Sequence, residues 1–174
     1  MNFTRFEHAS VFPVEVEVLW GFHMRPDSLR LLTPPELDIT IFDTQTHVAE
    51  GSVVHATVGR GVLRGPWSEL FTGFDVNRGY TDVALEGPFP FWEHRHEFEV
   101  VGRGRVMLRD VIWYSVEGLT RHAIGGRVVS QSLRELFAWR HARTLDLLRR
   151  ARPARPRRAV HASRALVQPI PPHA

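Results

Sequence analysis

The pattern of apolar and polar positions predicts one strand and two short helices at the start of the chain. Residues 3–12 are rich in aromatic side chains, alternate imperfectly between apolar and polar positions and stop at Pro13, which together favour a strand. Because a proline suits the first turn of a helix, a helix is expected to begin at Pro13. Its support is a set of apolar residues at helical spacing: Val14, Val18, Leu19 and Phe22. A second short helix is expected before the stop at residues 33–35, and it contains Leu29, Leu31 and Leu32.

Residues 37–116 have the composition and spacing typical of β-strands. Aromatic and β-branched residues recur in six segments, and links containing Gly, Asn or Pro separate most of them. The candidate strands cover residues 38–42, 51–58, 66–74, 80–85, 91–100 and 105–116. Consecutive strands joined by short links favour an antiparallel meander.

The last predicted element is a long amphipathic helix over residues 126–150. This stretch contains no proline, and Pro153 and Pro156 follow it. Its inner side is formed at helical spacing by Val129, Leu133, Leu136, Phe137, Arg140, Thr144, Leu147 and Leu148. An antiparallel sheet curved around one long helix leaves a space between the two. The expected fold class is therefore α+β, with seven strands and an internal cavity.

Charge separates a folded domain at residues 1–150 from a basic tail at residues 151–174. All 22 basic residues are arginine, and seven of them follow Leu148, where no acidic residue occurs. Residues 1–148 hold 15 arginines against 19 acidic residues, a formal charge of −4. The tail is rich in Pro, Arg and Ala and lacks both interleaved aromatics and an apolar helical face. Neither a fold nor a specific nucleic-acid partner is expected for it.

Several classes of protein are excluded by composition and motifs. The chain has no cysteine, which rules out a disulfide scaffold, a thiolate zinc site and a cysteine nucleophile. We find no signal peptide and no apolar stretch long enough to span a membrane, so a cytoplasmic protein is expected. The serines lie in no nucleophile-elbow context, which gives serine hydrolase chemistry no support.

Residues 92–98 allow the clearest assignment of side chains to the two faces of a strand. Side chains alternate along a strand, so one face holds Trp92, His94, His96 and Phe98. The opposite face holds Glu93, Arg95, Glu97 and Glu99. The charged set is expected to face solvent, and the set with aromatic and histidine side chains is expected to line the cavity.

Three interpretations of the pair His94 and His96 are open. Both histidines could reach one metal ion, with His23, Asp82 or Asp110 as candidates for a third ligand. One of them could instead act as a general acid or base on a bound ligand. Both could also hydrogen-bond to buried partners. Because a buried polar group ordinarily needs only such a partner, we adopt the last interpretation and expect no metal and no cofactor.

Two acidic residues interrupt the predicted strands. Asp82 and Asp110 lie in β-like segments, where an acid is disfavoured unless it is exposed or paired. Asp110 shares its face with Leu108 and Ile112, so that face is expected to be buried. A His–Asp pair or a pair with Arg140 would satisfy it. The guanidinium of Arg140 could alternatively bind a carboxylate or phenolate of a ligand.

Four segments carry a resemblance to a known superfamily. They are the helix pair at 13–35, the Gly-Pro-Phe of 87–89 with the Trp-x-His-x-His-x-Phe of 92–98, Asp110 with Tyr114, and the aromatic-Arg-His stretch of 137–141. In this order they resemble START-like or SRPBCC proteins over residues 3–148, especially small bacterial ligand-binding or polyketide cyclase-like proteins. The resemblance implies a helix-grip fold, in which a seven-stranded sheet wraps around a C-terminal helix. It implies no single reaction, because the superfamily includes lipid carriers, hormone receptors and aromatases.

The expected function is binding of a small, largely hydrophobic ligand between the sheet and the last helix. The alternative is an enzyme of the polyketide aromatase/cyclase type that uses cavity His and Asp residues as acid and base. A third hypothesis is regulation of a partner through the basic tail. The expected ligand-binding residues are Trp92, His94, His96, Phe98, Asp110, Tyr114, Phe137 and Arg140. Catalytic residues and oligomeric state stay open.

Overall fold

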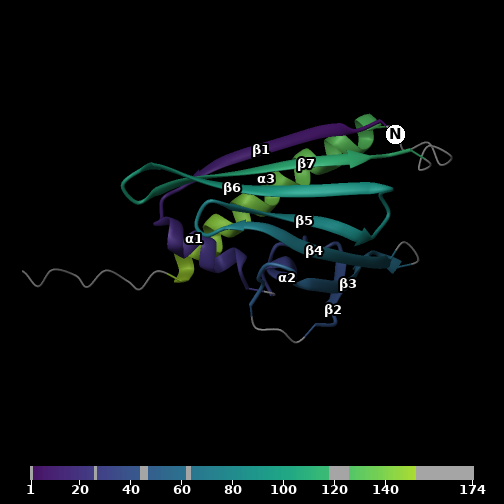
Figure 1. The fold of residues 1–174 in the computed structure, drawn as a ribbon, viewed down its shortest axis with the longest axis horizontal. Coiled ribbons are helices and arrows are strands. Elements are labelled where there is room, and N and C mark those ends of the chain that lie inside the picture. Colours follow the sequence, from purple (N-terminus) through teal and green to yellow (C-terminus); the bar gives the residue numbers. More distant parts are fainter. Residues whose placement is uncertain (1, 26, 44–46, 62–63, 118–125, 152–174) are drawn as a thin grey trace, which may run out of the picture.

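The computed structural model describes residues 2–25, 27–43, 47–61, 64–117 and 126–151. It contains a seven-stranded antiparallel sheet, two short helices and one long C-terminal helix, which confirms the predicted α+β class. In chain order the elements are β1 (Thr4–Phe12), α1 (Val16–His23), α2 (Ser28–Leu31), β2 (Asp38–Ile41), β3 (Val53–Gly59), β4 (Gly65–Asp75), β5 (Gly79–Glu86), β6 (Phe91–Gly102), β7 (Arg105–Ser115) and α3 (Gly126–Ala151). Figure 1 shows this arrangement. The tail at residues 152–174 lies outside the described residues.

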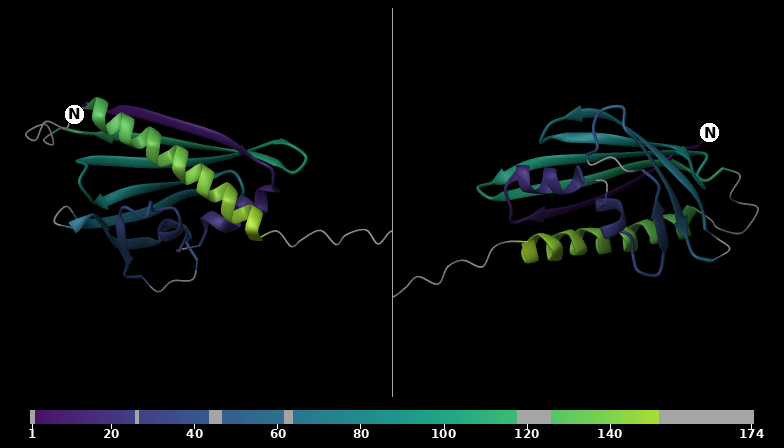
Figure 2. Two further views of the ribbon diagram at one scale, coloured as in Figure 1. Left: turned by 180° about the vertical axis from the view of Figure 1, so that it is seen from behind. Right: turned by 90° about the horizontal axis from the view of Figure 1, so that it is seen from below.

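The sheet is a meander closed by its first strand. Its order is β1-β7-β6-β5-β4-β3-β2, and every neighbouring pair is antiparallel. The first strand therefore lies beside the last one, while β2 forms the opposite edge. Helix α3 runs diagonally across one face of the sheet, and the sheet curves over it (Figure 2). This arrangement gives the sheet one covered face and one face toward solvent.

Two tight turns connect neighbouring strands in the middle of the sheet. The β6–β7 hairpin turns at Arg103-Gly104, where Gly104 has a φ of 61°. The β4–β5 hairpin passes through Asn77 with a φ of 63°. Glycine and asparagine are the residues that adopt this left-handed conformation most readily, which explains their presence at both turns. Both turns lie where the sequence predicts them.

The inner side of α3 follows the helical repeat. Its buried side chains are Val129, Leu133, Phe137, His141, Thr144 and Leu148, spaced three or four residues apart. The first half of this side packs in an apolar cluster with Phe6, Trp92, Ile112 and Tyr114. Leu148 packs in a second cluster with Phe12, Leu19, Leu108 and others. Between the two clusters α3 presents the polar residues Arg140, His141 and Thr144, so a polar layer crosses the middle of the molecule.

The structure corrects details of the first helix. Helix α1 begins at Val16, after Pro13 and an extended Glu15, so the proline lies before the helix. Val18 was expected on the apolar side but is 51% exposed. The buried side is formed by Leu19, Phe22 and His23. A β-branched residue in a short helix can face either side, and here the contacts of α1 with β6 and β7 decide which side is covered.

No helix within the described residues is both long enough and apolar enough to cross a membrane.

Candidate functional site

Three neighbouring strands place two aspartates and two histidines on the face that α3 covers. Asp82 of β5 lies opposite His94 of β6, and Asp110 of β7 lies opposite His96. Residues that are directly opposite or two apart share one face of a sheet, so all four side chains meet. Asp82, His94 and Asp110 are buried, and the side chain of His96 is 12% exposed. We call these four residues the Asp–His cluster.

Each ring nitrogen of the two histidines faces a carboxylate oxygen. His94 Nε2 is hydrogen-bonded to Asp110 Oδ1 at 2.9 Å, and His96 Nε2 to Asp82 Oδ2 at 3.0 Å. His94 Nδ1 lies 3.4 Å from Asp82 Oδ2. His96 Nδ1 lies 2.9 Å from Asp110 Oδ1, outside hydrogen-bond angles. Acids and imidazoles therefore alternate around a closed ring.

Helix α3 contributes a further histidine to the cluster. His141 Nε2 is hydrogen-bonded to Asp110 Oδ2, so this carboxylate contacts three imidazoles. Burial opposes a charge on Asp110, but the hydrogen bonds from His141 and His94 and the close contact with His96 outweigh it and hold the pKa of Asp110 well below its ordinary value. Asp110 is therefore the anionic centre of the cluster and ties α3 to the sheet.

The two strand histidines differ in their affinity for a proton. Burial lowers the pKa of both, but at His96 the nearby carboxylates of Asp110 and Asp82 prevail and raise the pKa to about 9. Burial and the neighbouring His96 lower the pKa of His94. His96 is thus a cation at neutral pH, and His94 is the neutral imidazole beside it.

Two aromatic residues flank His96. Tyr80 stacks on it with ring centroids 4.2 Å apart, and the edge of the His23 ring meets it at 5.8 Å. His23 Nδ1 lies 2.9 Å from the Leu19 carbonyl oxygen, which can only accept, so Nδ1 carries the proton. Burial lowers the pKa of His23 to about 4. His23 is therefore neutral, and its Nε2 carries a lone pair.

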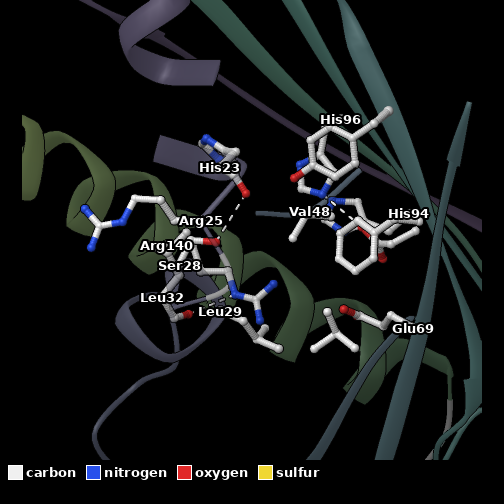
Figure 3. Close-up of a pocket in the computed structure, with 14 residues that line it drawn as sticks. His23, Arg25, Ser28, Leu29, Leu32, Val48, Glu69, His94, His96 and Arg140 are labelled. Atoms are coloured by element: carbon white, nitrogen blue, oxygen red, sulfur yellow. Dashed lines mark hydrogen bonds and ion pairs between the residues drawn. The ribbon is translucent and has the colours of Figure 1, made fainter. Parts of the chain in front are cut away.

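An apolar cavity of about 280 Å³ lies between the sheet and the first half of α3. Trp67, Phe89, Trp92, Leu133 and Leu136 form much of its wall. A second space of about 70 Å³ lies next to it, beside the Asp–His cluster. Glu69, His94 and Arg140 line both spaces, and Figure 3 shows these three side chains around the smaller one. The apolar cavity therefore ends at a group of polar side chains.

Glu69 and Arg140 are the donors at this polar end. Burial, together with the charge of Asp82, raises the pKa of Glu69 to about 8, so its carboxyl is protonated at neutral pH. Its Oε1 accepts a 2.6 Å hydrogen bond from Trp67 Nε1. Arg140 Nε donates to the Leu32 carbonyl oxygen at 3.0 Å, which fixes the guanidinium at the end of α2. No ion pair to Arg140 is formed within the described residues.

Solved structures share this architecture at low sequence identity. No protein-family model and no curated protein sequence matches the chain. Norcoclaurine synthase from Thalictrum flavum, solved with dopamine and hydroxybenzaldehyde, is 13% identical, with a TM-score of 0.64 over 88% of this chain and 90% of that chain. Protein Ms6760 from Mycobacterium smegmatis is 16% identical, with a TM-score of 0.64 over 87% and 99%. The chain has the helix-grip fold. At these identities the likeness concerns the fold, and it agrees with the predicted SRPBCC resemblance.

The helix-grip structure brings most predicted site residues to the cavity walls. Trp92, His94 and Arg140 line the larger cavity, and His96 lines the smaller one. Asp110 and Phe137 line a space of about 30 Å³ behind them. The remaining two residues lie in the core: Phe98 packs against Trp20 and Tyr80, and the Tyr114 hydroxyl is hydrogen-bonded to Ser130 Oγ at 2.8 Å. The role of all eight in ligand binding is still a prediction.

The sequence analysis missed two polar residues of the candidate site, His141 and Glu69. His141 follows the buried Phe137 by four residues, and that spacing would have placed it on the inner side of α3. Glu69 lies two residues from both Trp67 and Phe71 along β4. Residues at this spacing share one face of a strand, which would have placed an acid on the inner face. Of the two suggested partners of Asp110, the histidine is present and Arg140 is bonded elsewhere.

Proposed function

We propose that this protein binds a small ligand with an apolar body and one oxygen-bearing end that accepts hydrogen bonds. The observation that carries the proposal is the apolar cavity of about 280 Å³ that ends at Arg140 and Glu69. Arg140 always donates, and a protonated Glu69 carboxyl can donate as well. A ligand carbonyl or carboxylate at this end is therefore favoured over an amine.

The size of the cavity suggests a ligand of about two aromatic rings. An apolar cavity of about 150 Å³ holds one benzene molecule. The space here is nearly twice as large, and aromatic side chains such as Trp67, Phe89 and Trp92 form part of its wall. Flat ring systems pack well against such walls. One of the two ligands in the similarly folded norcoclaurine synthase structure, hydroxybenzaldehyde, has this kind of chemistry on a smaller scale, and the other is dopamine.

The geometry supports binding better than acid–base catalysis. A catalytic histidine needs a ring nitrogen within hydrogen-bond reach of its substrate. All four ring nitrogens of His94 and His96 face Asp82 or Asp110. Neither of these two histidines therefore directs a ring nitrogen at the apolar cavity, as the polyketide cyclase-type alternative would require.

Binding of two matched probes tests the proposal. We expect 2-naphthoate to quench the fluorescence of Trp67 and Trp92 with saturable affinity, because both rings line the cavity. Arg140→Met should weaken 2-naphthoate about 10-fold or more, since a hydrogen bond to a charged group contributes about 1.5–3 kcal/mol. The same variant should leave the affinity for 2-methylnaphthalene unchanged.

The exposed Arg134 on the same helix provides the control. Arg134→Met should bind both probes as the wild type does. If 2-naphthoate affinity is the same in the wild type and Arg140→Met, Arg140 does not hold the oxygen-bearing end. If neither probe saturates, the cavity is not a binding site for this class of ligand.

A further inference from the structure

The three residues that meet beside the smaller cavity have the donors of a metal site. Asp82, His94 and His96 each offer one ligand atom, and these atoms lie within 4.8 Å of one another. Asp82 Oδ2 is 3.4 Å from His94 Nδ1 and 3.0 Å from His96 Nε2. Ligands about 2.0–2.1 Å from a tetrahedral zinc ion are about 3.3 Å apart. The two separations measured from Asp82 Oδ2 are close to this edge length.

The other ring nitrogens are placed as they are in metal-bound histidines. A histidine ligand typically donates its second ring N–H to a carboxylate, which fixes the tautomer and the ring orientation. Asp110 Oδ1 is hydrogen-bonded to His94 Nε2 and lies 2.9 Å from His96 Nδ1. With protons on these two nitrogens, His94 Nδ1 and His96 Nε2 present lone pairs toward Asp82. A metal ion at this place would replace the proton between His96 Nε2 and Asp82 Oδ2, and His94 Nδ1 could reach the same ion.

A second observation points to the same place. Asp82 Oδ1 is buried without a hydrogen-bond partner within the described residues, although Asp82 is only 3% exposed. An unsatisfied buried carboxylate oxygen is costly, and coordination of a cation would remove that cost. The other oxygen of this carboxylate, Oδ2, faces His94 Nδ1 and His96 Nε2, so a cation bound by Asp82 can also reach both imidazoles.

We infer that Asp82, His94 and His96 bind one zinc ion, with Asp110 as the positioning residue for both histidines. All three ligands line the space of about 70 Å³ that His23, Glu69, Tyr80 and Arg140 complete. A fourth coordination position can therefore take a water molecule or a ligand oxygen from this space (Figure 3). Three protein ligands and one open position are typical of zinc sites that bind an exchangeable group. The zinc site does not depend on the ligand proposed above.

Titration of the full, tag-free chain with Zn²⁺ and Co²⁺ tests this inference. After treatment with a chelator, the wild type should bind one Zn²⁺ per chain, and Co²⁺ in its place should give the intense visible absorption of tetrahedral cobalt. His94→Ala and His96→Ala should abolish the cobalt spectrum. Asp110→Asn removes no ligand, so it should keep the stoichiometry and weaken affinity about 10–100-fold. His55→Ala, at an exposed histidine paired with Asp43, should change nothing.

A second measurement needs no variant and therefore does not depend on how the variants fold. Anomalous diffraction at the zinc edge from a crystal of the Zn²⁺-loaded wild type should give one peak between Asp82, His94 and His96. The inference is wrong if the folded wild type binds no Zn²⁺ at one equivalent per chain. It is also wrong if the peak lies elsewhere, or if a folded His94→Ala variant keeps the cobalt spectrum.

Discussion

At the scale of single residues, the site combines buried acids of opposite behaviour. Asp110 keeps its charge because three imidazoles contact it. Glu69 is buried and lies in the field of Asp82, and its hydrogen bond from Trp67 Nε1 does not offset these effects, so it takes up a proton. Burial favours the neutral form of both carboxyls, and the hydrogen bonds and charges around each one decide whether it keeps its charge.

The raised pKa of Glu69 makes stability depend on pH. Its folded-state pKa of about 8 lies above the ordinary 4.5, so between these values the folded state binds the extra proton. The contribution of Glu69 to the free energy of unfolding therefore falls as the pH rises, by up to about 1.4 kcal/mol per pH unit. The fall ends above pH 8, where Glu69 is ionised in both states. Glu69→Gln should remove this fall. Urea unfolding of chelator-treated protein from pH 5 to 9 measures it.

The exposed Glu135 is the control for this prediction. Glu135→Gln should keep the pH dependence of the wild type. A Glu69→Gln variant whose stability follows the wild-type curve across this range would show that Glu69 is ionised in the folded state.

Removing the centre of the Asp–His cluster should destabilise the protein strongly. Asp110→Ala leaves His94, His96 and His141 without their shared carboxylate, and breaking a buried charged pair costs about 3–5 kcal/mol. Asp146→Ala removes an exposed partner of Arg143 and Arg150 and should cost less than about 1 kcal/mol. Urea unfolding curves compare the two variants. If both variants lose the same free energy of unfolding, the Asp–His cluster contributes no more to stability than a surface ion pair does.

At the scale of elements, β5 and β6 must approach closely for the cluster to form. Gly79 starts β5 opposite Glu97, and an added Cβ would lie 2.6 Å from the backbone oxygen of His96. Apart from its chain neighbours and the backbone of its own helix, no described part of the chain comes within 4 Å of the Cβ position of Gly21, in the middle of α1. Gly79 is therefore required by the close approach of β5 and β6, whereas the position of Gly21 has room for a side chain.

Alanine substitution should separate these two glycines. Gly79→Ala should destabilise the protein, because the backbone of β6 must move away. Gly21→Ala should stabilise it by about 0.5–1 kcal/mol, because alanine is the better helix former and leaves the site untouched. Thermal unfolding monitored by circular dichroism gives the sign of both changes. A stabilised Gly79→Ala variant would contradict the close approach of β5 and β6.

The sequence predicted elements better than contacts between them. Period-two alternation predicted the inner face of β6 correctly, since Trp92, His94 and Phe98 are buried, and helical spacing predicted α3. The diagonal contact of His96 with Asp82 depends on the register of β5 and β6, which turn geometry sets. The bond of Arg140 to the end of α2 depends on where a four-residue helix packs, and no periodicity reports that.

At the scale of the whole molecule, the helix-grip fold divides its interior into three parts. An apolar cluster surrounds the larger cavity near the start of α3, a second apolar cluster fills the other end, and the polar layer lies between them. The proposed ligand site is therefore one end of an incompletely filled core, and the polar layer supplies its polar end. This division explains why an apolar body and an oxygen-bearing end suit the same ligand.

A crystal structure of the protein grown with 2-naphthoate tests this proposal most directly. We predict electron density for the ring system between Trp67, Trp92 and Leu133, with the carboxylate within hydrogen-bond distance of Arg140. Saturating ligand that binds only on the outer face of the sheet, or a cavity filled by rearranged side chains of α3, would contradict it.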